Sequence, residues 1–320
     1  MFSLFYKPVF LLLIVIFSLP GCTSEQPGTL KVGTNVWPGY EPLYLARASD
    51  LWEPGRISII EYNSASEVLR AFRNESLDVA ALTLDEAISL IADRPDTRIF
   101  MGIDFSAGAD VVIVQPDIEV AGELRGKSIG VESTAVGAYM LARFLEVNRL
   151  VLSDINIVFM AVDRHAQAFS QREVDAVVTF EPVKTQLLKQ GGRTLFSSND
   201  IPGEVLDVLV TRQDVIQQKA EQLQALTAGW FQSLTIIKEH REVALLKMAP
   251  RMGISSQELD IAMQGLKLLN SEDNQHLLRA ENATIKETAI KIERLMLSNG
   301  LLAKPVFNEG YINSQFVDKK

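Results

Sequence analysis

Cysteine is almost absent from this chain of 320 residues, in which Cys22 is the only one. A single cysteine excludes an internal disulfide and a zinc site made of four cysteines. Histidine is nearly as scarce, with three residues in the sequence. All three fall in helices expected at the surface, without a second ligand at metal spacing, so no metal site is expected. These residues are His165, His240 and His276.

Positive charge is in the minority, with 31 Lys and Arg against 40 Asp and Glu and a formal net charge of −9. A chain this acidic has no general attraction for nucleic acid, and no Lys- and Arg-rich stretch is present to hold anionic lipid. The sequence also lacks a Gly-x-Ser-x-Gly elbow, a phosphate-binding loop and a dinucleotide fingerprint. We therefore expect neither an enzyme nor a bound cofactor.

The N-terminal segment has the pattern of an export signal. Lys7 is followed by an apolar run over residues 9–17, which is shorter than the roughly 20 residues of a membrane span. The next residues end in Leu-Pro-Gly-Cys at Cys22, which resembles the bacterial lipobox, although Pro20 is a less usual residue there. We predict a lipoprotein signal peptide over 1–21, lipidation of Cys22 and a polar tether over 22–29. The alternative is a plain secretory signal with an incidental cysteine.

The length suits two domains, and from Leu30 onward short strands and helices alternate in two successive blocks. Two neighbouring strands without a helix between them, at 98–104 and 109–114, separate the blocks, and a strand at 207–211 leads back. The alternation within a block predicts a parallel sheet with helices on both faces. Residues from 213 onward are expected to be nearly all helix. We therefore predict two α/β lobes joined by two hinge strands, with a helical C-terminal tail.

The predicted boundaries place residues 30–108 and 208–320 in lobe 1 and residues 109–207 in lobe 2. A short internal echo suggests that the lobes are built alike. Residues 77–83 (LDVAALT) and 174–179 (VDAVVT) each read as a buried strand that ends in Thr at a loop. An acidic residue, Asp85 or Glu181, follows each of them. The echo is too short to count as a sequence repeat.

Ligands of open α/β sheets bind outside the carboxyl ends of the strands, which directs attention to the loops at those ends. Trp37 and Tyr40 follow the first strand and can form an apolar wall or a cation–π surface, or else pack as a simple turn. Glu132, Ser133 and Thr134 lie between a strand and a helix, where free backbone N–H groups suit an anion. Simple capping by Ser133 or Thr134 is the alternative.

An acidic set lies at the strand ends of both expected lobes. Taken singly, each carboxylate is explained as a helix cap or a surface charge, and Glu181 before Pro182 fits a cap. Taken together, they favour an ammonium, amidine or guanidinium group. The members of the set are Asp85, Asp110, Glu132, Glu181 and Asp207.

Three stretches, at 32–46, 124–131 and 174–182, resemble the solute-binding proteins of ABC importers for nitrate, sulfonates, taurine and thiamine precursors. The resemblance implies the two-lobed type II periplasmic-binding-protein fold (Venus flytrap), with ligand trapped between lobes that close around two hinge strands. It implies a monomer outside the cytoplasmic membrane that delivers ligand to a permease and ATPase. It also puts seven residues in the cleft: Trp37, Tyr40, Asp85, Asp110, Ser133, Thr134 and Glu181.

Glu132 departs from the family, whose anion-binding members usually offer small or hydroxyl residues in that loop. Its carboxylate argues against a bare anion and leads us to expect an amine-bearing sulfonate, an aminopyrimidine or a guanidine-like compound. Two other functions stay open. One is a ligand sensor for a membrane signalling partner. The other is an enzyme on the same fold, but the export signal and the lack of a catalytic base disfavour the enzyme.

Overall fold

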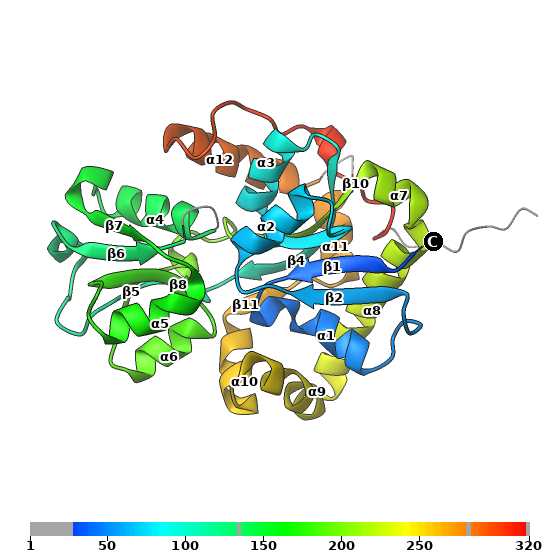
Figure 1. The fold of residues 1–320 in the computed structure, drawn as a ribbon, viewed down its shortest axis with the longest axis horizontal. Helices are drawn as coiled ribbons and strands as arrows, with labels where there is room; N and C mark the ends of the chain where they lie inside the picture. The colour runs from blue at the N-terminus through cyan, green and yellow to red at the C-terminus, as the bar shows by residue number, and fades with distance from the viewer. Residues whose placement is uncertain (1–27, 133–135, 280–282, 318–320) are drawn as a thin grey trace, which may run out of the picture.

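The computed structural model describes residues 28–132, 136–279 and 283–317 and consists of two α/β lobes that lie side by side (Figure 1). Lobe 1 denotes the part built on a six-stranded sheet and lobe 2 the part built on a five-stranded sheet. The predicted two-sheet α/β class is therefore confirmed. The predictions for the signal peptide, for Cys22 and for Ser133 and Thr134 lie outside the described residues. Within those residues, every helix is too short or too polar to span a bilayer.

The sheet of lobe 1 has the strand order β11-β4-β10-β3-β1-β2. Its strands are β1 (Leu30–Thr34), β2 (Ile57–Glu61), β3 (Val79–Thr83), β4 (Thr97–Ser106), β10 (Leu206–Arg212) and β11 (Leu266–Leu268). In Figure 1, α2 and α3 lie over one face and α1 and α8 over the other. The helices of this lobe are α1 (Glu41–Ala48), α2 (Ala65–Arg73), α3 (Leu84–Asp93), α7 (Gln213–Gln218), α8 (Ala220–Glu239), α9 (Arg241–Met248), α10 (Ser256–Gln264), α11 (Ser271–Leu278) and α12 (Ile285–Ser298).

The sheet of lobe 2 has the order β7-β6-β8-β5-β9. Its strands are β5 (Asp110–Val114), β6 (Ser128–Val131), β7 (Asn156–Phe159), β8 (Ala176–Phe180) and β9 (Arg193–Ser197). Helix α4 (Val136–Val147) lies over one face, and α5 (Val162–Ser170) and α6 (Val183–Lys189) lie over the other. Each sheet is therefore covered on both sides, which explains why its central strands β3 and β8 are buried along their whole length.

Local capping contacts begin two helices of lobe 1. The Ser64 side chain accepts the Glu67 N–H at 3.3 Å, and the Thr83 N–H donates to Glu86 Oε2 at 2.9 Å. Helix α2 then turns Val68 and Leu69 inward, together with other apolar residues of one face. The helix starts are thus fixed by local chemistry, while burial of one face holds each helix on its sheet.

The internal echo of the sequence corresponds to one backbone motif that occurs in both lobes. In lobe 1, the Lys31 N–H donates to Asp78 Oδ2 at 2.8 Å, and the Asp78 N–H donates to the Lys31 carbonyl at 2.9 Å. In lobe 2, the Ser128 N–H donates to Asp175 Oδ2 at 2.9 Å, and the Asp175 N–H donates to the Ser128 carbonyl at 2.8 Å. Each aspartate therefore fixes the entry of a central strand, β3 or β8, beside its parallel neighbour.

The strands of each alternating block pair in parallel, as predicted, whereas the strands that cross between the lobes do not. The sheets are mixed, because β10 runs antiparallel to β3 and β4, and β5 runs antiparallel to β8 and β9. The sequence analysis also missed β9, a half-exposed edge strand, and β11, three residues long, which interrupts the helical tail and pairs with β4. A short edge strand contains few buried apolar residues, so the alternation of apolar and polar residues that predicts a strand is weak there.

The surface position expected for His165 is also wrong, because this side chain is 1% exposed. It shares the inner face of α5 with Val162, Ala168 and Phe169, at a helical spacing of three and four residues. The apolar neighbours place the imidazole against the sheet of lobe 2. His240 and His276 are exposed, as predicted.

Two chain crossings connect the lobes and contact each other. The hydroxyls of Ser106, at the end of β4, and Ser198, on the return path, are hydrogen-bonded at 2.8 Å. The Gly108 N–H donates to Ser198 Oγ at 2.6 Å, and the Asp110 N–H donates to Ser106 Oγ at 3.2 Å. The two crossings therefore form one hydrogen-bonded unit at the junction of the lobes.

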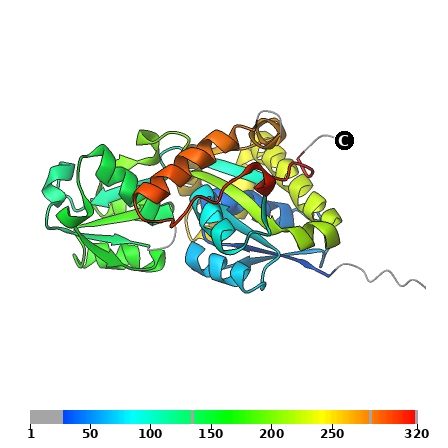
Figure 2. The same ribbon diagram turned by 90° about the horizontal axis from the view of Figure 1, so that it is seen from above.

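A second junction is centred on Glu204, which precedes β10 and has a side chain that is 3% exposed. It accepts from Tyr139 at 2.7 Å and from Arg143 Nε at 2.7 Å, both on α4 of lobe 2. Lys291 of α12 lies 2.8 Å from the same carboxylate. Figure 2 shows α12 extending toward lobe 2, so the C-terminal part of the chain supports both lobes.

Candidate ligand-binding site

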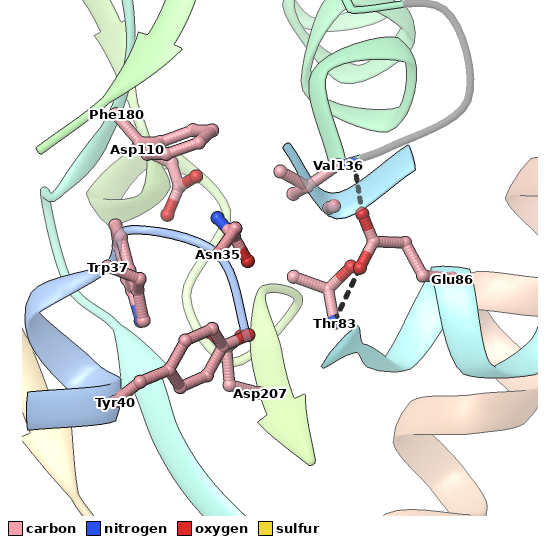
Figure 3. Close-up of a pocket in the computed structure, with 10 residues that line it drawn as sticks. Asn35, Trp37, Tyr40, Thr83, Glu86, Asp110, Val136, Phe180 and Asp207 are labelled. Atoms are coloured by element: carbon pink, nitrogen blue, oxygen red, sulfur yellow. Dashed lines mark hydrogen bonds between the residues drawn. The ribbon is translucent and has the colours of Figure 1, made fainter. Parts of the chain in front are cut away.

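A cavity of about 300 Å³ lies between the lobes. Figure 3 shows Trp37, Tyr40 and Phe180 on one side of it and Thr83, Glu86 and Val136 on the other. Both lobes supply its walls, so closing the lobes completes the cavity. The lining residues are Asn35, Trp37, Tyr40, Ala65, Thr83, Glu86, Asp110, Val136, Phe180 and Asp207.

The cavity lies at one edge of each sheet. Thr83 and Phe180 are the last residues of the parallel strands β3 and β8. Their partners in register are Asp207, which pairs with Thr83, and Asp110, which pairs with Phe180 on an antiparallel neighbour. At this edge the carboxyl ends of the parallel strands β3 and β8 therefore lie beside the first residues of the antiparallel strands β10 and β5. Ligands of α/β sheets bind at the carboxyl ends of the parallel strands.

Aromatic rings close the cavity from both sides. Trp37 of lobe 1 and Phe180 of lobe 2 meet edge to face, with ring centroids 5.7 Å apart. The indole N–H of Trp37 donates to Asp104 Oδ2 at 3.1 Å. Residues Pro38–Tyr40 form one 3₁₀ turn that carries the two rings of lobe 1 into the cavity. The turn and the aromatic wall, which the sequence left as alternatives, are one structure.

Gly39 allows the Trp37–Asp104 contact. A Cβ on Gly39 would lie 1.9 Å from Asp104 Oδ2 and 2.4 Å from Trp37 Nε1. Both distances are far below a van der Waals contact, so a side chain at this position would separate the indole from the carboxylate. Glycine is required here by space.

Four buried carboxylates surround the cavity: Glu86, Asp104, Asp110 and Asp207. Asp104 and Asp207 are direct cross-strand partners, and Tyr40 donates its hydroxyl to Asp207. Burial raises the pKa of Asp104 to about 8 and the pKa of Asp110 to about 7, and it raises the pKa values of Glu86 and Asp207 as well. The carboxylate cluster therefore retains protons near neutral pH, and a cation that enters it would favour the ionised forms.

Glu86 joins the lobes from within the cavity. Its Oε2 accepts the Thr83 N–H, while its Oε1 accepts the Val136 N–H of α4 at 3.3 Å (Figure 3). Glu86 was not among the predicted site residues, because one of its two contacts lies in the other lobe. Asp104, the last residue of the strand expected at 98–104, was not predicted either. It does not line the cavity itself but accepts a hydrogen bond from Trp37, which does.

The predicted site residues occupy different places. Trp37, Tyr40 and Asp110 line the cavity. Asp85 lies on a neighbouring hollow beside Tyr139, and burial raises its pKa to about 6. Glu132 Oε1 accepts from Ser66.

Glu181 faces its own helix rather than the cavity. Its Oε2 accepts the Thr185 N–H at 3.1 Å, and its Oε1 lies 3.2 Å from Lys184 Nζ. The capping role that the sequence offered for Glu181 is therefore present in the structure. Its charge is balanced by the neighbouring ammonium group.

Comparison with solved structures identifies the fold. The alkanesulfonate-binding protein SsuA of Xanthomonas axonopodis, solved with MOPS, has a TM-score of 0.75 at 18% identity over 90% of this chain and 99% of that one. SsuA of Escherichia coli gives 0.72 at 20% identity over 88% and 90%. The desulfurization enzyme DszB, solved with biphenyl-2-sulfinic acid, gives 0.63 at 16% identity over 90% and 97%. The predicted periplasmic-binding-protein fold is thus confirmed, and an enzyme shares it.

Sequence comparison identifies the family. A protein of Escherichia coli named as an aliphatic sulfonates-binding protein is 21% identical over 250 residues, which are 76% of this chain and 77% of that protein. The model of the NMT1-like family matches residues 23–246, more than half of the chain. The protein whose two lobes enclose this acidic, aromatic cavity therefore belongs to the NMT1-like family.

Proposed function

We propose that this protein is the extracytoplasmic solute-binding component of an ABC importer. It captures a small amine-bearing, zwitterionic or nitrogen-rich molecule between its lobes and delivers it to a permease. The observation that carries the proposal is the cavity between the lobes, in which both lobes supply buried carboxylates and aromatic rings. Its relatives of known name bind sulfonates, so the candidates are a taurine-like aminosulfonate, an aminopyrimidine and a guanidine-like compound.

The chemistry of the cavity favours a ligand with a cationic group. Three aromatic rings offer faces for cation–π contact, and Asp110 and Asp207 offer charge. A bare anion is disfavoured, because the Val136 N–H at the start of α4 already donates to Glu86. An anion at this helix end would have to displace a carboxylate that holds the lobes together.

Capture then works as a shift between open and closed populations, because the ligand touches both lobes only when they are closed. In this proposal lobe 1 consists of residues 30–108 and 208–320, lobe 2 of residues 109–207, and the crossings act as the hinge. Among the predicted site residues, Trp37, Tyr40 and Asp110 contact the ligand. Asp85, Glu132, Ser133, Thr134 and Glu181 are carried as secondary candidates.

The proposal includes the N-terminal segment. Residues 1–21 are a signal peptide, Cys22 receives the lipid, and residues 22–29 tether a monomer to the outer side of the cytoplasmic membrane or to the cell surface. A membrane sensor in place of the importer is a second possible partner for the same binding chemistry. Neighbouring genes distinguish the two, because a permease with an ATPase indicates import and a sensor kinase or cyclase indicates signalling.

A second candidate function, catalysis, is favoured by the shared fold of the enzyme DszB. The buried Asp110, with its raised pKa, has the protonation behaviour that a general base needs. Incubating the protein with each bound compound and analysing the mixture for product decides the matter. Turnover supports the enzyme, and recovery of unchanged ligand supports the binding protein.

A thermal-shift screen of the purified protein tests the proposal. The panel contains taurine, alkanesulfonates, nitrate, aminopyrimidines, guanidine compounds and polyamines. A ligand at about 100 times its Kd adds about 2.7 kcal/mol of stability, which is a shift of several degrees for a chain of this size. We expect hits among the nitrogen compounds, and we expect Asp207→Asn to abolish them.

Asp50→Asn is the matched control, because Asp50 is exposed on a turn far from the cavity lining. It should leave every shift unchanged. Hits limited to nitrate and simple alkanesulfonates would overturn the ligand class. If a compound still shifts the melting temperature of Asp207→Asn, it binds outside this cavity.

A further inference from the structure

A second cavity, the deep pocket, lies in lobe 2 behind Phe180. It measures about 230 Å³, with room between its side chains for about one water-sized group. Asp110, Val136 and Phe180 line both this pocket and the cavity between the lobes. The two spaces therefore share a wall made by one aromatic ring, one carboxylate and the first residue of α4.

Polar atoms without a hydrogen-bond partner among the described residues face the deep pocket. Asp110 contributes Oδ2, Glu132 contributes Oε2 and Thr179 contributes Oγ1. His165 also lines the pocket and adds one ring nitrogen, because the other is hydrogen-bonded to the backbone of Met160. These side chains are between 1% and 6% exposed, so bulk water does not satisfy them.

Such a concentration of unsatisfied groups is costly. A buried polar atom without a partner loses its hydration and gains nothing in return, and folded proteins pair nearly all such atoms. The atoms here come from β5, β8, α5 and the loop after β6, which are four separate parts of lobe 2. Independent elements that point unpaired groups at one small space indicate that an occupant satisfies them.

The groups specify the chemistry of that occupant. Two carboxylates and a hydroxyl offer acceptors, and burial lowers the pKa of His165 to about 4, so its neutral ring adds one acceptor nitrogen at pH 7. Acceptors therefore outnumber donors, and the carboxylates favour positive charge. The free space fits one water-sized group. An ammonium has that size and carries three N–H donors, whereas guanidinium and trimethylammonium are larger.

The geometry points to the deep pocket as a subsite for a primary ammonium group of the ligand, with the rest of the ligand in the cavity between Trp37 and Tyr40. This inference rests on the proposed function and deepens it. Phe180, which lines both spaces, would then lie beside the alkyl part of the ligand. A primary amine is selected over its methylated forms, because only the former fits the pocket and donates to Asp110, Glu132 and Thr179.

The first test uses the imidazole of His165 as a local probe. The full-length protein is labelled with ¹⁵N-histidine, and its three ring spectra are assigned with His240→Gln and His276→Gln, which change exposed residues. Taurine and n-propylamine are added, each beside its N,N,N-trimethyl derivative. We expect the primary amines to shift the His165 signals and to bind at least tenfold more tightly than the trimethyl forms.

The second test compares two isosteric substitutions. Thr179→Val removes the hydroxyl in the pocket, and Thr194→Val, on the exposed part of β9, is the control. We expect Thr179→Val to weaken binding of the primary amine by at least fivefold while the control has no effect. Asp207→Asn tests the outer cavity in parallel.

The outcomes separate this inference from the proposed function. If a primary amine binds and Asp207→Asn weakens it, but His165 does not shift and Thr179→Val has no effect, the subsite is refuted and the outer cavity stands. If the trimethyl forms bind as tightly as the primary amines, the subsite is refuted as well. If none of the amines binds, the proposed ligand class fails and the subsite fails with it.

Discussion

Ser66 and Glu132 lie on opposite lobes and are joined by two hydrogen bonds. The backbone N–H and the hydroxyl of Ser66, in the first turn of α2, donate to Glu132 Oε1 at 3.3 and 2.5 Å. Together with the contact between Glu86 and Val136, they hold the lobes closed through groups of the protein itself. These contacts favour the closed arrangement of the lobes, and a ligand that touches both lobes would add to them.

Ser66→Ala should shift the lobes toward the open form. It removes a hydrogen bond to a carboxylate, which is worth about 1.5–3 kcal/mol in favourable cases. We expect a larger radius of gyration in small-angle X-ray scattering of the ligand-free protein and a weaker apparent affinity, because the competent fraction falls. Ser58→Ala, on the exposed side of β2, is the control. An unchanged radius and affinity would show that the Ser66 hydroxyl does not hold the lobes.

Gly39→Ala adds only one methyl group, but it should lower both the stability of the protein and its affinity for the ligand. The new Cβ would displace Asp104 or the Trp37 ring, since both lie within 2.4 Å of its position. Overpacking of this kind costs about 1–3 kcal/mol, and the displaced indole should also lower ligand affinity. Chemical denaturation and calorimetric titration measure the two effects. Gly122→Ala, where nothing lies within 4 Å, should be neutral, and equal behaviour of both variants would contradict the steric argument.

The ligand-free protein should lose stability as the pH rises from about 4 to about 8. In the unfolded chain an aspartate ionises near pH 3.9, whereas folded Asp104 keeps its proton to about pH 8 and Asp110 to about pH 7. The folded state thus binds more protons in this window, and each such group reduces the free energy of unfolding by up to about 1.4 kcal/mol per pH unit.

Asp104→Asn should flatten this pH dependence and raise the stability at pH 8. Urea unfolding at pH 5, 6, 7 and 8 measures it, with Asp50→Asn as the control on the exposed surface. Parallel curves for the wild type and Asp104→Asn would contradict the assignment. A cationic ligand should release protons on binding, so its affinity should rise with pH through the same range.

Glu204→Gln should weaken the junction between α4 and α12. The substitution removes the charge that pairs with Arg143 and Lys291 and leaves the largely buried guanidinium of Arg143 with Glu146 as its remaining carboxylate partner. We expect a loss of about 2–3 kcal/mol in the free energy of unfolding, measured by denaturant titration. Glu287→Gln, exposed on α12, should cost less than about 0.5 kcal/mol. If Glu204→Gln also cost less than about 0.5 kcal/mol, the junction would not contribute to the stability of the fold.

Much of the fold was predictable because its signals are local. Capping at Ser64 and Thr83 starts helices whose inner faces the sequence also shows. The pair Asp78 and Asp175 marks equivalent strand entries in both lobes, which the repeated sequence indicated. Strand direction was not predictable for β5 and β10, because it depends on how the chain crosses between lobes rather than on any local pattern.

The site was predictable only where a single loop builds it. Trp37 and Tyr40 share one turn after β1, and Asp110 begins a strand, so the strand-end rule found them. Glu86 was not predicted as a site residue, because its second hydrogen bond goes to Val136 in the other lobe. Contacts across the lobes depend on their relative orientation, and a one-dimensional pattern contains no information about that.

The position of Trp37 gives the protein an intrinsic optical reporter. The chain has three tryptophans, and the other two, Trp52 and Trp230, pack in the core of lobe 1. The Trp37 indole alone among them faces the cavity, touches Phe180 of the opposite lobe and donates to Asp104. Occupation of the cavity, opening of the lobes and ionisation of Asp104 should each alter its emission. Fluorescence of the unlabelled protein can therefore follow ligand capture in real time.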